Sequence, residues 1–487
     1  MFYDRYKVLH NIATSLCGIL ECNKIGLNWF RYDINILFKI AGYNLNIDSM
    51  LRHIENRTLK SKIFYIPLLR NYIINKINQK FNRYEISVNF SIKYNNIQTA
   101  KYDIICFLSM QTYFSPIKEV IKRNKDKKIL ILLPYEYKNW FNKDSINDIL
   151  NQNNIDYEFI DIFFDKNEII KIKNKLLNNF DKNFYKIKNS FCFNGINLFD
   201  AYKESLRDFI DYFLSLQIVF NKNLYNYLQN KVKYNTEFYI TRDRRALENA
   251  FIQIGNRLND NTNMIIHGMI SKNHDLRYIT DGSFSNVTNL YVWGQHDYDV
   301  IIERQKLLNE NIPHIKIGKY LFFNKIEKKD EKYILFALQG ETLYLVEEIV
   351  KLKFEGYKIL IRLHPSHKDY IEKYKKYENE YIEIDNLDEN LDKRLENTYV
   401  FISFYSTAIL ESLYNNIPTL IMNFDELEKD KNIFLENNLD KSEEQIMFCN
   451  SWNDLIRKIN DFENQKIDIL KVNMKLKNYF IKVSNVK

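Results

Sequence analysis

Three polar segments in the second half of the chain each follow an apolar, strand-like run of residues. They are Gln339-Gly340 after YILFAL, His364-Pro365 after ILIRL, and Ser406-Thr407 after VFISFY. Open parallel sheets bind their ligands outside the carboxyl ends of the strands. We therefore expect the three segments to lie along one rim of a sheet, and we predict a ligand-binding site there.

The segment after VFISFY has the residue types of a phosphate site. Ser406 and Thr407 open a predicted helix, whose first N–H groups have no internal partner and attract an anion. Glu411 lies four residues after Thr407 on the same helical face, where its carboxylate could accept hydrogen bonds from ribose hydroxyls. The plainer alternative is that Ser406 only caps the helix and Glu411 lies on the surface.

The HPSH segment places His364 directly after a buried strand. An imidazole there can donate a hydrogen bond to a leaving phosphate or act as a general acid near neutral pH. Pro365 restricts the backbone and could hold the imidazole toward the ligand. His367 is predicted to be a surface residue.

Two residues in the first half of the chain are candidates for a general base. His267 ends the strand-like run TNMIIHG, and Asp281 lies in a Thr-Asp-Gly segment a short way on. Either could deprotonate an acceptor hydroxyl. Their alternative roles are a hydrogen-bonded core histidine for His267 and an ordinary turn residue for Asp281.

Strand-like and helix-like runs alternate along most of the chain, which predicts an α/β fold with two doubly wound parallel sheets facing a cleft. We expect strands at 102–110, 127–135, 157–164, 237–243, 262–270, 289–294, 333–340, 357–366, 381–385, 398–406 and 417–424. The helices that bear on the site are expected at 341–356 and 406–416.

The predicted domains follow from this alternation. Residues 1–95 form a region without an assigned role, 96–323 form the first Rossmann-like domain, and 333–487 form the second, which ends in helices. A helical insertion is expected at about 200–232. The charged segment 324–332, NKIEKKDEK, is the predicted linker.

Composition restricts the protein class. The chain has 487 residues, 46% of them hydrophobic, and a formal net charge of +8. The positive charge suits an anionic substrate. The sequence has no Arg-rich stripe with interleaved aromatic residues, the pattern that would indicate nucleic-acid binding. Five irregularly spaced cysteines, no signal peptide and no run of about 18 uncharged apolar residues predict a cytoplasmic protein, whose contact with the inner membrane would be peripheral.

The order of the motifs resembles bacterial capsule and lipopolysaccharide glycosyltransferases of the GT-B fold. That group includes Kdo transferases, sialyl- and polysialyltransferases, and the CDP-glycerol glycerophosphotransferases of teichoic-acid synthesis. The matching segments are IIHG at 265–268, YVWG at 291–294, RLHP at 362–365, and YSTAILESLYNNIP at 405–418. The resemblance covers roughly residues 235–425.

The resemblance implies a donor linked to a cytidine nucleotide, whose phosphate would contact the His-Pro and Ser-Thr segments, and catalysis without a metal or cofactor. In the sialyltransferase branch the base is an acidic residue of a D/E-D/E-G motif, for which only Asp281 is available here. In the CDP-glycerol branch it is the histidine of the HG motif, here His267. The branch and the base therefore stay open.

Our leading hypothesis is an inverting transfer of a sialic acid-like sugar or Kdo from its CMP ester to a glycan or lipid-linked glycan of the cell surface. Within the same fold, the alternatives are transfer of a polyol phosphate from CDP-glycerol and transfer of a sugar from UDP or GDP. A sugar-nucleotide epimerase and a non-catalytic subunit of a glycan-assembly machine are the further alternatives.

Overall fold

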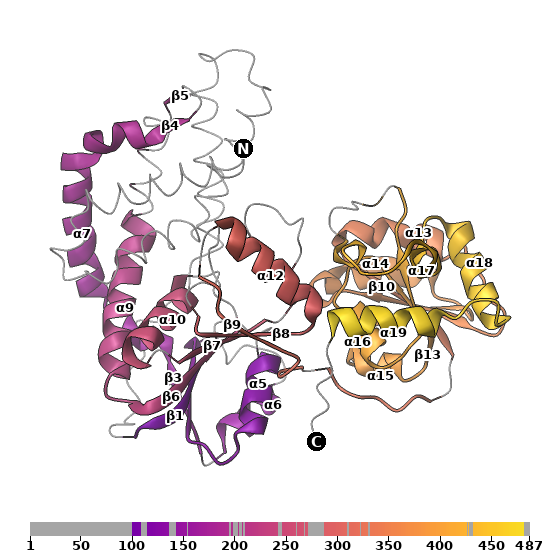
Figure 1. Ribbon diagram of the computed structural model, residues 1–487, viewed down its shortest axis with the longest axis horizontal. Helices are drawn as coiled ribbons and strands as arrows, with labels where there is room; N and C mark the ends of the chain where they lie inside the picture. The colour runs from indigo at the N-terminus through magenta and orange to yellow at the C-terminus, as the bar shows by residue number, and fades with distance from the viewer. Residues whose placement is uncertain are drawn as a thin grey trace. The chain divides into compact units, whose positions relative to one another are not determined.

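The protein was analysed as a computed structural model (Figure 1). The structure describes residues 100–481 with these gaps: 109–113, 136–142, 153, 194–195, 198–202, 204–206, 208–209, 242–245, 260, 267, 271–286, 309–310, 322, 330–331, 426 and 428–431. The described residues form two compact units. The first holds those up to 266, 287–291 and 304–315, and the second holds 268–270, 292–303 and those from 316 onward.

The first unit is built on a seven-stranded sheet in the order β3-β2-β1-β6-β7-β8-β9. Its strands are β1 (Tyr102–Phe107), β2 (Ile129–Leu133), β3 (Ile155–Phe159), β6 (Val232–Ile240), β7 (Thr262–Ile265), β8 (Asn289–Val292) and β9 (His314–Ile317). The pairs from β3 to β8 are parallel. All five residues of β2 are buried, as expected for a strand covered on both faces.

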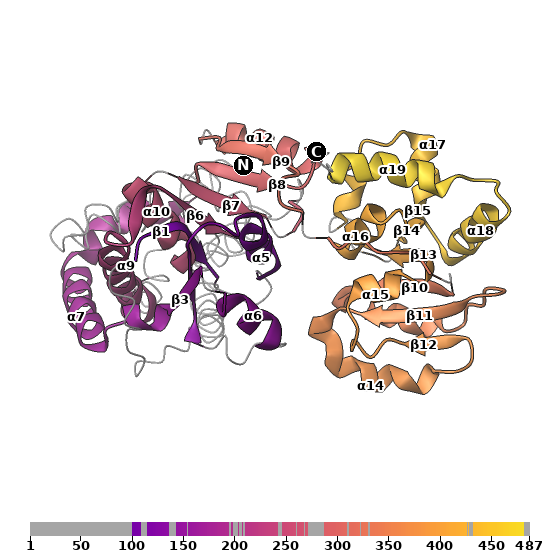
Figure 2. The same ribbon diagram turned by 90° about the horizontal axis from the view of Figure 1, so that it is seen from below.

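Helices cover both faces of this sheet. On one face lie α5 (Phe114–Arg123) and α6 (Lys143–Leu150), and on the other α9 (Ser215–Leu228) and α10 (Ala246–Asn259) (Figures 1 and 2). Helix α12 (Gln295–Leu308) connects β8 to β9, and its residues 295–303 belong to the second unit.

The connection from β3 to β6 is long. It contains η4 (Ile160–Phe163), α7 (Lys166–Asn183), η5 (Phe184–Phe191), the β4-β5 ribbon (Cys192–Phe193, Ile196–Asn197) and the π-helical turn η6 (Ile210–Leu214). The predicted strand at 157–164 was placed too late, because η4 takes its second half. The strand predicted at 237–243 starts five residues earlier, at Val232, because Tyr102 pairs with Val232 across the sheet.

The second unit contains a six-stranded sheet in the order β12-β11-β10-β13-β14-β15, with every pair parallel. The strands are β10 (Tyr333–Leu338), β11 (Lys358–Leu363), β12 (Ile382–Ile384), β13 (Thr398–Ser403), β14 (Thr419–Met422) and β15 (Phe448–Cys449). Counted along the chain this order is 3-2-1-4-5-6, the doubly wound arrangement. The predicted fold class, α/β with two doubly wound sheets, is therefore confirmed.

Helices again lie on both faces, with α13 (Val346–Ile349) and α14 (Ile371–Tyr374) on one and α16 (Ala408–Tyr414) and α19 (Ile469–Phe480) on the other (Figures 1 and 2). Shorter elements are η8 (Gly340–Leu345), η9 (Pro365–Tyr370), η10 (Lys375–Tyr377), α15 (Leu391–Leu395) and η12 (Ile433–Leu435). The C-terminal part adds α17 (Lys441–Met447) and α18 (Trp452–Glu463).

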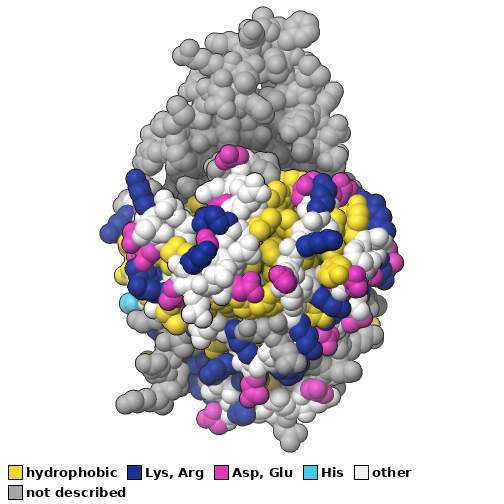
Figure 3. All heavy atoms as spheres, turned by 90° about the vertical axis from the view of Figure 1, so that its right-hand side faces the viewer, with side chains coloured by type: hydrophobic (Ala, Val, Ile, Leu, Met, Phe, Trp, Pro, Cys, Tyr) yellow, Lys and Arg dark blue, Asp and Glu magenta, His cyan; other side chains and the backbone are white. Residues whose placement is uncertain are grey.

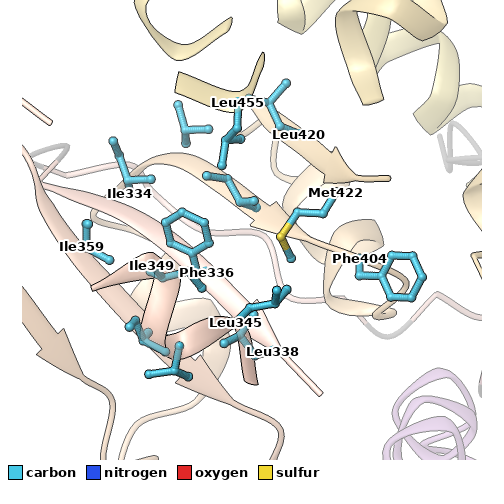
Figure 4. Packing of buried hydrophobic residues seen from close by; sticks show 14 of the residues in the cluster. Ile334, Phe336, Leu338, Leu345, Ile349, Ile359, Phe404, Leu420, Met422 and Leu455 are labelled. Atoms are coloured by element: carbon cyan, nitrogen blue, oxygen red, sulfur yellow. The ribbon is translucent and has the colours of Figure 1, made fainter. Parts of the chain in front are cut away.

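The core of the second unit forms between the sheet and these helices. Alternate residues of β10, among them Ile334 and Phe336, meet Leu420 of β14, Ile349 of α13 and Leu455 of α18 (Figure 4). Each is at most 1% exposed. Removing so much apolar surface from water is the main force that fixes the strand order, and hence the position of the strand ends.

In this unit one predicted element was wrong and one strand was not predicted. The helix at 341–356 is only η8 followed by the four-residue α13, because the chain turns tightly at Gly340 and reverses again at Gly356, whose φ is +80°. Strand β15 was not predicted. It has two residues, and only its pairing with Ile421 and Met422 of β14 makes it a strand.

Candidate functional site

The strand order of the second sheet creates a switch point between β10 and β13. The chain leaves these neighbouring strands toward opposite sides of the sheet, and doubly wound proteins bind ligands at the carboxyl ends of such a strand pair. Strand β11 flanks β10 on its other side. The structure therefore brings the three predicted segments, after β10, β11 and β13, to one edge of the sheet.

Gly340 and His367 meet at the end of β10. Gln339 follows the strand directly, and its backbone N–H donates to Thr342 Oγ1 at 2.9 Å, which closes a tight turn. A Cβ built on Gly340 would lie 3.0 Å from Nε2 of His367. Glycine thus keeps the backbone of the turn accessible beside this imidazole, which the sequence had placed on the surface.

His364 is the first residue after β11. Its N–H donates to Leu338 O at 2.8 Å, so its backbone continues the ladder between β10 and β11. Pro365 then begins η9, and the rings of His364 and His367 lie 6.2 Å apart in an edge-to-face arrangement. Desolvation of the His364 ring lowers its pKa, and the neighbouring His367 lowers it further. At neutral pH His364 is therefore an uncharged hydrogen-bond donor or acceptor.

The segment after β13 opens α16. Ser403 Oγ donates to Ala337 O at 2.7 Å and so joins the ends of β13 and β10. Ser406 is buried, and its Oγ accepts from the N–H of Ala408 at 3.2 Å. Thr407 is the N-cap residue and is exposed, without a cap bond from its own side chain. The two hydroxyls therefore differ: one is engaged with the backbone of the turn and the other is exposed.

Glu411 lies on α16, one turn after Thr407, and is partly buried. Burial raises the pKa of its carboxyl to about 7; the negative charge of Asp392 adds to this effect and the positive charge of Arg362 opposes it. A carboxyl group with such a pKa exchanges its proton near neutral pH, so it can both donate and accept hydrogen bonds there.

The sequence did not identify a buried ion cluster at the same edge. Asp385 follows β12 directly and is 0% exposed. It is ion-paired with Arg362, the penultimate residue of β11, and with Arg394 of α15, whose NH2 lies 3.2 Å from Asp385 Oδ1. Arg362 also donates to Glu389 O at 3.0 Å. The signal was available, because an aspartate directly after a strand obeys the same edge rule as His364.

The two candidate bases, His267 and Asp281, lie outside the described residues. Strand β7 ends two residues before His267, at Ile265. The neighbouring Gly268 is described, and nothing lies within 4 Å of a Cβ built on it.

Among the residues that the structure describes, no group of three His, Cys, Asp or Glu side chains could hold a metal ion. No helix in the described part is long and apolar enough to cross a membrane. Figure 3 shows one face on which lysine and arginine side chains alternate with acidic ones around an apolar area, without a continuous basic patch.

Taken together, the rim offers an accessible backbone turn at Gly340, the imidazoles of His364 and His367, the hydroxyl of Thr407 and the titrating carboxyl of Glu411. Such a set can hold a phosphate by neutral donors and a sugar ring by a carboxylate.

No protein-family model matches the chain, and no curated protein matches it. Among solved structures, the UDP-GlcNAc 2-epimerase from Neisseria meningitidis bound to UDP-GlcNAc aligns over 77% of this chain and 94% of its own, at 10% identity and a TM-score of 0.45. The wall teichoic acid polymerase TagF with CDPG aligns over 91% of this chain and 94% of its own, at 11% identity and a TM-score of 0.43. The lipopolysaccharide outer core galactosyltransferase WaaB aligns over 78% of this chain and 96% of its own, at 8% identity and a TM-score of 0.40. At these scores the likenesses carry no argument, and the fold assignment rests on the strand order itself.

Proposed function

We propose that the chain is a glycosyltransferase that binds a nucleotide-activated donor at the carboxyl edge of its second sheet. The observation that carries the proposal is the convergence of Gly340, His364 and Thr407 at the switch point between β10 and β13. Donor phosphates are bound at such an edge by backbone N–H groups and uncharged side-chain donors.

The proposed donor is a CMP-activated acidic sugar, sialic acid-like or Kdo, as the HP and YST motifs suggest. An acceptor hydroxyl on a surface glycan would lose its proton to His267 or Asp281. Its oxygen would then form a bond to the anomeric carbon, while the bond from that carbon to the phosphate oxygen of CMP breaks, with inversion. The reaction needs no metal in this proposal.

The described residues would act on the departing phosphate. His364 has a lowered pKa, so its ring arrives uncharged and donates an N–H hydrogen bond to a phosphate oxygen. The negative charge on that phosphate grows as CMP leaves. A hydrogen-bond donor held in place by the protein therefore interacts more strongly with the transition state than with the bound CMP-sugar. Glu411 would bind hydroxyls of the ribose.

Thermal stabilisation by CMP, CDP, UDP and GDP tests the proposal. A ligand that binds only the native state adds about 2.7 kcal/mol of stability at one hundred times its dissociation constant. We expect CMP and CDP to raise the melting temperature of the wild type and not that of His364→Ala. His314→Ala is the matched control, because His314 is exposed on β9 of the first sheet.

The other outcomes point to the alternatives. A preference for UDP or GDP would replace the donor and keep the site. Transfer of glycerol phosphate, read from the product mass, would replace the sugar by a polyol phosphate. Turnover of a donor without an acceptor would indicate an epimerase, and no stabilisation by any nucleotide would contradict the proposal in favour of a non-catalytic subunit.

A further inference from the structure

A histidine of the second unit is buried between two carboxylates. His296, the second residue of α12, is 0% exposed. Its Nε2 lies 3.1 Å from Glu436 Oε2, and its Nδ1 lies 3.7 Å from Asp297 Oδ1. Asp297 is itself fixed, because it accepts from the N–H of Trp293 at 3.3 Å and of Ile270 at 3.1 Å. Two buried carboxylates in an apolar setting are costly unless a positive charge between them compensates their own.

Electrostatics favours the charged form of this ring. Burial alone would lower the pKa of His296, but the Asp297 and Glu436 carboxylates outweigh it, so the pKa is raised. The other titratable residue that packs on the ring is Tyr479. Burial raises the pKa of Tyr479, and the charges of Asp299, Glu436 and Asp297 raise it further, so Tyr479 stays neutral. The two charged groups that raise the pKa of His296 most are thus both acids.

The last turn of α19 covers this histidine. The ring of Phe480 lies 4.5 Å from the His296 ring, and that of Tyr479 lies 5.6 Å from it. The ring of Phe434 lies 5.1 Å from that of Phe480. A Cβ built on Gly294 would lie 2.3 Å from the backbone of Phe480. The glycine of the YVWG motif therefore makes room for the C-terminal helix.

Helix α19 also contacts α16 and β14, two elements of the unit that carries the candidate site. Lys477 Nζ donates to Tyr414 O at 2.8 Å and to Asn416 Oδ1 at 2.9 Å, which are at the end of α16 and just beyond it. The buried Asn473 exchanges two hydrogen bonds with the backbone of Thr419, the first residue of β14. Helix α19 thus connects the surroundings of His296 with α16, the helix that carries Glu411.

We propose that His296, Asp297, Glu436 and Phe480 form a pH-sensitive clasp that holds α19 on the start of α12 and against α16. The inference goes beyond the proposed function and stands whichever ligand the rim binds. Protonated His296 pairs with both carboxylates. Loss of its proton removes the positive charge that lies between these carboxylates, and α19 loosens.

The sign of the pH dependence follows from the raised pKa of His296. The clasp is at full strength below the pKa of an unfolded-chain histidine, about 6.5, and it weakens as the pH rises through the higher pKa of the buried ring. Between these two pKa values, the equilibrium constant for closing the clasp falls about tenfold for each unit of pH.

Amide hydrogen exchange of the whole protein between pH 6 and pH 9 tests the clasp. After correction for the intrinsic exchange rate, the protection of α19 should fall as the pH rises. In His296→Gln, whose neutral amide cannot be protonated, protection at pH 6 should be lower than in the wild type. The two proteins should converge at pH 9. His314→Gln, altered at an exposed histidine, should behave like the wild type at every pH.

Three results would overturn the inference. One is a wild-type α19 that exchanges equally at pH 6 and pH 9. Another is a His296→Gln defect of the same size at both pH values, since packing of the ring alone would then explain it. If His296→Gln does not fold, Glu436→Gln and the NMR titration of His296 in the wild type decide: a midpoint below about 6.5 contradicts the clasp.

Discussion

The second unit contains two buried ion clusters that differ in the kind of cation they contain. At the rim, Asp385 is paired with the guanidinium groups of Arg362 and Arg394. In the clasp, the carboxylates of Asp297 and Glu436 flank one imidazole, that of His296. The first cluster has two cations for its central acid, and the second has two acids for its central base.

This difference separates a permanent contact from a switchable one. Guanidinium groups keep their charge over the whole pH range in which proteins fold, and their forked geometry fixes direction as well as charge. Imidazole changes charge between about pH 5 and pH 8. The ligand rim is thus supported by a cluster that holds its shape, while the C-terminal helix is held by a cluster that can release it.

Asp385→Ala should give the largest effect. It leaves two guanidinium groups without their shared buried carboxylate and removes the acceptor of the Leu387 N–H, which is 3.0 Å from Asp385 Oδ1. Breaking one side of a buried ion pair costs about 3–5 kcal/mol. We expect that loss in the free energy of unfolding of the second unit, read from the amide exchange of β10 and β11.

Asp388→Ala is the matched control for this variant, because Asp388 is exposed three residues further on. Its effect should stay within about 0.5 kcal/mol. The loss in Asp385→Ala should also be the same at pH 6 and pH 9, whereas a loss confined to low pH is expected for the clasp. A pH-dependent loss at Asp385 would remove the distinction between the clusters.

Gly294→Ala should act on the clasp alone. Its new methyl group would meet the carbonyl of Phe480 at 2.3 Å and that of Tyr479 at 2.5 Å, and a backbone cannot yield as a side chain can. Overpacking of this kind costs about 1–3 kcal/mol. We expect faster amide exchange in α19 and unchanged exchange in β10 and β11.

Gly268→Ala provides the comparison for that methyl group, since nothing lies within 4 Å of a Cβ at Gly268. It should leave the exchange of α19 unchanged. Equal effects of the two alanines, or a Gly294→Ala variant that weakens β10 as much as α19, would mean that α19 does not open separately from the sheet.

Local patterns predicted most of the frame. The unbroken apolar runs of β2 and β10 mark strands buried on both faces, and this property is visible in any short window of sequence. The two-residue β15 could not be predicted in this way, because it is a strand only through its pairing with β14. The helix predicted at 341–356 was too long, because a turn bond between Gln339 and Thr342 takes up its start and only α13 is α-helical.

The candidate site shows the same division. The positions of His364 and Ser406 could be predicted because His364 directly follows β11 and Ser406 lies three residues after the end of β13. His367 and Arg362 take part through side chains that meet Gly340 and Asp385, and those contacts depend on packing between elements distant in the chain. The sequence around His296 shows only the neighbouring Asp297, because the second carboxylate comes from Glu436, 140 residues away, and α19 closes over the ring.

Glu411→Gln should give the smallest effect of the three, and it tests whether the rim contains a pH-dependent group beside its permanent cluster. The native carboxyl, with a pKa of about 7, holds its proton more tightly than an unfolded-chain glutamate does. The native state is therefore favoured by protonation, and this contribution is lost as the pH rises from about 4.3 to about 7. Glutamine resembles the protonated form.

We therefore expect Glu411→Gln to be more stable than the wild type at pH 8, by about 1–2 kcal/mol, a value reduced because the carboxyl is partly solvated. The gain should shrink steadily below pH 7, as measured by amide exchange of α16. If the rim also binds a nucleotide, the same variant should bind it more weakly at pH 8, because glutamine accepts from ribose hydroxyls less strongly than a carboxylate. Stability and affinity would then change in opposite directions, as expected for a buried carboxyl kept for binding. A variant that loses both would instead make Glu411 a purely structural neighbour of Arg362.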